Sequence, residues 1–94
     1  AAKAAVIAMT RSGALELAEH GIRVVGVAPG FIDTPMMKNV PDEARASLAA
    51  QHVTNQLIQP EKVASVVAFL FTDAASAVNG STVAADDGFL AFKV

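Results

Sequence analysis

One stretch decides the fold of this 94-residue chain: Ile22-Arg23-Val24-Val25-Gly26-Val27-Ala28-Pro29-Gly30-Phe31-Ile32-Asp33-Thr34. Residues 22–28 form a nearly continuous apolar run, which is typical of a strand buried on both faces. Pro29-Gly30 ends the run, because proline cannot donate to a sheet and glycine lets another group approach the backbone closely. Asp33 and Thr34 follow just past the carboxyl end of this predicted strand, where open parallel α/β sheets bind ligands. The stretch therefore predicts one edge of a binding site.

Helices and strands alternate around this run. We expect helices over residues 1–20, 42–51 and 60–72, irregular chain over 36–41, and a second short strand over 81–85. Gly21 predicts a left-handed end for the first helix, and Pro60 suits the first turn of the third. In the first helix, two rows of small residues (Ala1, Ala5, Gly13; Ala4, Ala8, Ser12) and the larger Val6, Met9, Leu15 and Leu17 are expected to pack against neighbours. The order favours an α/β fold with a parallel sheet, and two strands are too few to stand alone, so we expect half of a domain.

Composition argues against several classes of function. The chain is 53% apolar and 17% charged, with a net charge of −2 and no basic cluster, which argues against a nucleic-acid-binding or anionic-membrane surface. No apolar run reaches the length of a membrane-spanning helix, and the start lacks the layout of a signal peptide. Without cysteine there is no disulfide framework and no thiolate metal site. A cytoplasmic protein is the default expectation, which the absence of cysteine permits but does not establish.

Three motifs carry a resemblance to a known family over essentially the whole chain. They are residues 1–5, Ala-Ala-Lys-Ala-Ala; residues 21–24 running to 29–34; and residues 79–82 with 86–89. Together they resemble the short-chain dehydrogenase/reductase family. The first is similar to the end of the family's Tyr-x-x-x-Lys motif and the small residues after it, and the other two resemble the family's later strands and the loops after them. The resemblance implies the carboxyl-terminal half of a Rossmann-like doubly wound parallel sheet. Residues 1–94 would be the carboxyl-terminal part of a single domain, with a mobile substrate lid at about 35–59.

The family's activity is NAD(P)-dependent hydride transfer between nicotinamide and an alcohol or ketone, and the resemblance implies it here, with NAD or NADP as cofactor and no metal. Lys3 would be the catalytic lysine, which lowers the pKa of the family's tyrosine from about 10 and hydrogen-bonds the nicotinamide ribose. Pro29 and Gly30 would shape the turn against the nicotinamide. Ile32 and Thr34 would hold its carboxamide through a main-chain amide and a hydroxyl. The alternative is that Thr34 is only the N-cap of the following helix, and capping and cofactor binding are compatible.

The chain departs from the family pattern in two ways. The tyrosine would lie two residues before Ala1, and the family's serine, asparagine and Gly-rich loop belong to the other half of the fold. Residues 1–94 are therefore expected to be inactive alone. Val25 stands where the family usually has asparagine, and Asp87 where it usually has glycine. We interpret the remaining candidates as structural: Asp33, Asp73, Asp86 and Asp87 as turn and cap residues, His20 as a cap residue, and His52 as a lid or surface residue.

Two kinds of function stay open. One is an enzyme acting on a small-molecule alcohol or ketone and assembling as a homodimer or homotetramer, with residues 81–94 buried between chains. The other is a non-catalytic fragment that self-associates or binds a partner through an exposed sheet edge. An intact mass near 9.6 kDa favours the fragment, and a much larger one favours the enzyme. Either way, we expect apolar surface that the chain does not cover itself.

Overall fold

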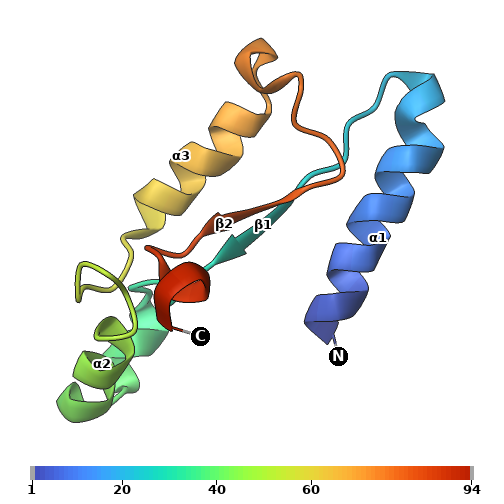
Figure 1. The fold of residues 1–94 in the computed structure, drawn as a ribbon. Coiled ribbons are helices and arrows are strands. Elements are labelled where there is room, and N and C mark those ends of the chain that lie inside the picture. The colour runs from blue at the N-terminus through green and yellow to red at the C-terminus, as the bar shows by residue number, and fades with distance from the viewer. Residues whose placement is uncertain (1, 94) are drawn as a thin grey trace. The chain divides into compact units, whose positions relative to one another are not determined.

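A computed structural model describes residues 2–93. The main elements are α1 (Ala2–Leu17), β1 (Gly26–Pro29), α2 (Asp42–Ala49), α3 (Pro60–Leu70) and β2 (Thr82–Ala85), which Figure 1 shows in chain order. Short 3-10 helices occupy Ala18–His20, Pro35–Asn39 and Asp73–Ala75, and a π-helical turn occupies Phe89–Lys93. The predicted order of helix, strand, helix, helix and strand is confirmed. The structure differs over 36–41, where the chain expected to be irregular is mostly 3-10 helix.

β1 and β2 form a two-stranded parallel sheet, seen side by side in Figure 1. Gly26 N–H donates to the Ser81 carbonyl (2.9 Å), and Gly30 N–H donates to the Ala85 carbonyl (3.3 Å). Both bonds have the same offset in sequence, which is the pattern of a parallel ladder. The expected α/β fold with a parallel sheet is confirmed.

The described chain divides into two compact units, residues 2–28 with 67–83 and residues 29–66 with 84–93. In the first unit, α1 meets the start of β1 through residues that leave little room. Thr10 and Ala14 are both 7% exposed. A Cβ on Gly26 would lie 3.4 Å from the Thr10 hydroxyl oxygen, and one on Gly13 would lie 3.6 Å from a Val24 methyl group. The small size of Gly13 and Gly26 therefore allows α1 and β1 to pack closely here.

Most of the face predicted to be buried on α1 is exposed. Val6, Met9 and Leu15 are 58%, 71% and 82% exposed, and Leu17 is also exposed. Ala4, Ala5, Ala8 and Ser12, from the two rows of small residues, are exposed as well. Within residues 2–93 these side chains are not covered, so the expectation that they pack against neighbours stays a prediction. The expectation of uncovered apolar surface is confirmed.

The predicted strand at 22–28 is shorter than expected, since β1 begins only at Gly26. Before it, the Val24 carbonyl accepts from Gly80 N–H (2.8 Å), and side chains make the other long-range bonds. Val24 N–H donates to the Asn79 amide oxygen (3.0 Å). The Arg23 guanidinium donates to the carbonyls of Leu70 (2.7 Å) and Val78 (3.1 Å). Arg23 thus satisfies a carbonyl at the carboxyl end of α3, where helices leave acceptors unpaired and favour cations.

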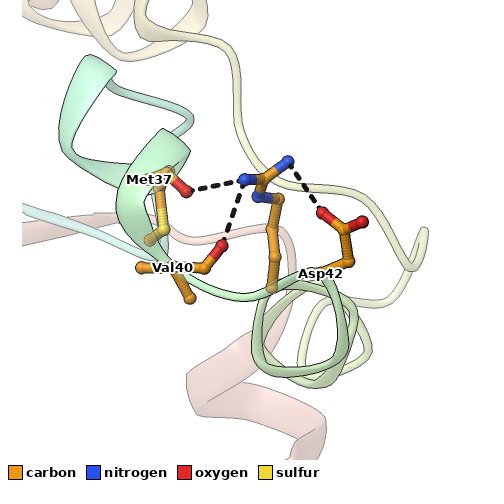
Figure 2. A network of polar contacts seen from close by, with 4 residues as sticks. Met37, Val40 and Asp42 are labelled. Atoms are coloured by element: carbon orange, nitrogen blue, oxygen red, sulfur yellow. Dashed lines mark hydrogen bonds and ion pairs between the residues drawn. The ribbon is translucent and has the colours of Figure 1, made fainter.

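In the second unit, one arginine ties the 3-10 helix Pro35–Asn39 to α2. Arg45 donates to the carbonyls of Met37 (2.9 Å) and Val40 (3.2 Å), as Figure 2 shows. Its guanidinium also lies 3.8 Å from the Asp42 carboxylate, one helical turn earlier. The segment predicted as a lid therefore has internal order, with the arginine bonding one carbonyl within the 3-10 helix and one just after it.

Candidate functional site

The turn after β1 is crowded from one side. Pro29 is the last residue of β1 rather than the residue beyond it, and Gly30 follows. A Cβ on Gly30 would lie 2.7 Å from His52 Nε2 and 3.2 Å from the Asp86 Cα. Glycine is required here by close approach, as predicted, and not by a positive φ, since Gly30 has none.

Ile32 presents a main-chain amide that the described residues leave unused. The Phe31 carbonyl accepts from Ile58 N–H (3.0 Å), and Asp33 N–H donates to the Ile58 carbonyl (2.8 Å). These two bonds make the parallel bridge between Ile32 and Ile58. In such a bridge the amide of the central residue points to the opposite edge of its strand. No hydrogen bond from Ile32 N–H is found within residues 2–93.

The sheet register explains why none of residues 2–93 pairs with this amide. The ladder pairs Gly26 with Ser81 and Gly30 with Ala85, so two further residues would pair Ile32 N–H with the Asp87 carbonyl. The chain turns away first, because Asp87 adopts a left-handed conformation with φ 49°. Its carbonyl accepts from Val53 N–H instead (2.8 Å).

Thr34 stands at the N-cap of the 3-10 helix Pro35–Asn39 but does not cap it with its side chain. Its backbone is extended, with φ −107° and ψ 167°, and its carbonyl accepts from Met37 N–H (2.9 Å). The hydroxyl makes no hydrogen bond within the described part of the chain. Thr34 therefore occupies the N-cap position, but its side chain does not cap the helix. The hydroxyl is thus available to a ligand.

Lys3 lies in the first turn of α1 and is exposed. It belongs to the unit of residues 2–28 and 67–83, whereas Pro29, Gly30, Ile32 and Thr34 belong to the other unit. The second unit brings those four residues together along one continuous turn. The role of Lys3 rests on its motif and stays a prediction.

His52 is the functional candidate that the sequence interpretation missed. It was expected to be a lid or surface residue, but it has no exposed surface. Its Nε2 accepts from Phe31 N–H (3.1 Å), and its Nδ1–H donates to the Gln56 carbonyl. Its ring stacks on that of Phe31, with centroids 5.7 Å apart and 26° between the planes. No local spacing could have revealed this role, because Phe31 lies 21 residues away in sequence.

The acidic pair after β2 shapes the turn there, as predicted. Asp86 is 9% exposed, and its carboxylate accepts from Gly88 N–H and Leu90 N–H, both at 3.1 Å. The Asp87 carboxylate accepts from the hydroxyl and the amide of Thr54. The Thr54 hydroxyl bond, ahead of smaller contributions, lowers the pKa of the Asp87 carboxyl. Both carboxylates act as turn and cap groups.

Two hollows lie within the second unit. One, of about 320 Å³, is lined by residues 84–88, by parts of 54–58 and by Lys62, Val63 and Val66 of α3. The other, of about 490 Å³, is lined by Asp33, Gln59 and residues of α2 among others. Ile32 and Thr34 line neither hollow. Within residues 2–93, no group of three or more acidic, histidine or cysteine side chains is placed to hold a metal ion. None of the described helices is both long and apolar enough to cross a bilayer.

Comparison with protein families gives one match across nearly the whole chain. The model described as "Enoyl-(Acyl carrier protein) reductase" matches residues 1–90. Among curated proteins, the cis-4-hydroxycyclohexanecarboxylate dehydrogenase of Sinomonas cyclohexanicum is 48% identical over 91 residues, covering 97% of this chain and 36% of the relative. The 3-oxoacyl-[acyl-carrier-protein] reductase FabG of Thermotoga maritima is 43% identical over 90 residues, covering 96% of this chain and 37% of that enzyme.

A solved structure gives the same result. A short chain dehydrogenase family protein from Francisella tularensis superposes with a TM-score of 0.84 at 34% identity. The match covers 95% of this chain and 41% of that protein. The chain thus spans roughly a third of the length of the curated relatives it matches.

Proposed function

The chain belongs to the short-chain dehydrogenase/reductase family, and on that premise we propose that it forms the carboxyl-terminal part of an NAD(P)-dependent oxidoreductase. The proposed reaction transfers hydride between nicotinamide and an alcohol or ketone. One observation of the fold carries the proposal: the turn after β1 offers the Ile32 amide and the Thr34 hydroxyl, and both are unused within residues 2–93.

The donor set of this turn fits a nicotinamide carboxamide. A primary amide has one carbonyl acceptor and two N–H donors. Ile32 N–H would donate to the carbonyl, and the Thr34 hydroxyl would accept from the amide nitrogen. Gly30 is crowded on the side of His52 and Asp86, so a flat ring would lie against the backbone of Pro29 and Gly30 on the opposite side of the turn. Bound there, the cofactor would supply or accept the hydride, while these residues orient it.

Lys3 has the remaining proposed role. An ammonium group one helical turn from a tyrosine favours the phenolate through its positive charge and so lowers the tyrosine pKa. The motif places that tyrosine one turn before Lys3. The lysine would thereby help the tyrosine to exchange a proton with the substrate oxygen at neutral pH, and it would also hydrogen-bond the nicotinamide ribose.

Nucleotide binding by the full-length protein tests the function directly. NADH and NADPH are titrated separately, and binding is followed by the fluorescence of the reduced nicotinamide. A panel of secondary alcohols is then screened for oxidation by the rise in reduced-nicotinamide absorbance. Binding of either nucleotide together with turnover of one alcohol or ketone supports the proposal. Failure of both nucleotides to bind contradicts it.

We propose in addition that the protein is a homodimer or homotetramer. Leu90 and Phe92 in the turn after β2 are 63% and 76% exposed, and Phe69 and Phe71 at the end of α3 are 49% and 84% exposed. Burying such side chains is worth about 1.5–3 kcal/mol each, and a second copy is the simplest cover. Sedimentation at micromolar concentration tests this, and a monomer with a protease-sensitive carboxyl terminus contradicts it.

A further inference from the structure

Residues 52–54, which we call the 52–54 brace, bond to the chain just beyond the ends of both strands. At β1, His52 accepts from Phe31 N–H (3.1 Å). At β2, Val53 N–H donates to the Asp87 carbonyl (2.8 Å), and Thr54 donates to the Asp87 carboxylate from its amide and its hydroxyl. Three consecutive residues thus tie together two turns that are far apart in sequence.

The histidine ring can make its two bonds in one protonation state only. A main-chain carbonyl only accepts, so Nδ1 must carry the proton that is donated to Gln56. Nε2 is then a lone-pair acceptor, which is what Phe31 N–H requires. Because His52 is fully buried, no water replaces either partner, and each unmade bond would carry a desolvation cost.

The brace acts on the two edges of the Ile32 segment in opposite ways. Within an extended residue the N–H and the C=O point to the same edge, so the Phe31 bonds to His52 and Ile58 hold that edge. The Ile32 amide points to the other edge, where the register would supply the Asp87 carbonyl. Val53 N–H occupies that carbonyl. The brace therefore fixes the turn through one edge and keeps the acceptor away from the other.

We propose that His52, with the 52–54 brace, is a positioning residue that presents the Ile32 amide to the nicotinamide carboxamide. The proposal rests on the proposed function for its ligand, but the contact from His52 to Phe31 does not. The substitutions H52Q and H52N separate the two bonds of the ring. The longer side chain of H52Q would place an acceptor near the Nε2 position, whereas the shorter one of H52N would keep only a donor near Nδ1.

The experiment compares H52Q and H52N in the full-length protein, with H20N as a control because His20 is exposed and outside the site. Since one hydrogen bond is lost, we expect H52N to bind NADH or NADPH about three- to tenfold more weakly than wild type, and H52Q and H20N to bind within about twofold of it. A merely structural role would weaken both His52 variants alike. Equal nucleotide affinity for wild type and H52N, with both folded, overturns the proposal.

Amide exchange of Phe31, measured by NMR on the same proteins without nucleotide, is the second readout. We expect slow exchange in wild type and H52Q, and faster exchange in H52N. If H52N fails to fold, the exchange rate of the Phe31 amide in wild type still tests the proposal. If that amide exchanges as fast as a surface amide, the hydrogen bond from Phe31 N–H to His52 does not exist. If wild type binds neither nucleotide, the proposed function fails and the presentation of Ile32 to a cofactor fails with it. Exchange then reports only whether the brace exists.

Discussion

Val53 N–H donates to the Asp87 carbonyl oxygen at 2.8 Å, and this is the carbonyl that the register of β1 and β2 would otherwise bring to Ile32 N–H. The left-handed φ of Asp87 makes the diversion possible, because an extended residue there would continue the ladder. Glycine adopts such a φ most easily, and aspartate is among the residues that tolerate it. Asp87 thus adopts a backbone conformation that glycine would adopt more easily.

The Asp87 side chain predicts a pH dependence of stability. Its pKa is lowered in the folded protein, chiefly by the Thr54 hydroxyl. A lowered folded-state pKa contributes stability that is full above the unfolded pKa, near 3.8, and is lost as the pH falls through the folded value. We expect T54V to raise the Asp87 pKa towards its ordinary value and to remove this contribution, and T54S to keep both. Carboxyl NMR titration measures the pKa, and an unchanged Asp87 pKa in T54V contradicts the assignment.

Gly30 should tolerate no side chain. G30A would place a methyl group 2.7 Å from His52 Nε2 and 3.2 Å from backbone at Asp86. Neither neighbour can move without breaking the brace or the turn after β2, so we expect a loss of about 1–3 kcal/mol in the free energy of unfolding.

The matched control for that change is G13A. Its new methyl group would meet Val24 at an ordinary 3.6 Å inside a helix, so we expect a gain of about 0.5–1 kcal/mol. Urea denaturation of both variants measures the difference. Equal stabilities for G30A and wild type would mean that the turn is looser than its contacts indicate.

Thr34 separates ligand binding from helix capping. Its hydroxyl caps nothing in the described chain, so we expect T34V to leave stability unchanged while weakening nucleotide binding, and T34S to retain binding. A side-chain N-cap would instead cost about 1 kcal/mol of stability on removal. Thermal unfolding and nucleotide titration of the same samples distinguish the two roles. Lower stability with normal nucleotide affinity would favour the cap.

Lys3 carries the only proposed catalytic charge in the chain. We expect K3M in the full-length protein to lower turnover by about 10²-fold or more, since this is the scale of general acid–base contributions. The pH optimum should move upward, because the tyrosine loses the positive charge that lowers its pKa. R11M removes a positive charge from the same helix, at another exposed position, and should change neither quantity. A K3M enzyme with the turnover and pH profile of wild type would refute the assignment.

The sequence by itself determined the elements whose signals are local. Gly21 ends the first helical segment in a left-handed conformation (φ 71°), and Pro60 is the first residue of α3. The break at Pro29-Gly30 located the end of β1, and Asp86 caps the turn after β2. These features follow from the conformational preferences of one residue and its near neighbours, so a single sequence is enough to predict them.

Only the tertiary structure decided which groups at the site are occupied and which are free. Three features depend on partners far along the chain: the burial of His52, the diversion of the Asp87 carbonyl, and the Ile32 amide that the described residues leave unpaired. Thr54 and Asp87 are 33 residues apart, and His52 and Phe31 are 21 apart. A hydrogen bond between such residues depends on how the strands align and how the turns pack, and no periodicity or spacing in the sequence encodes that alignment.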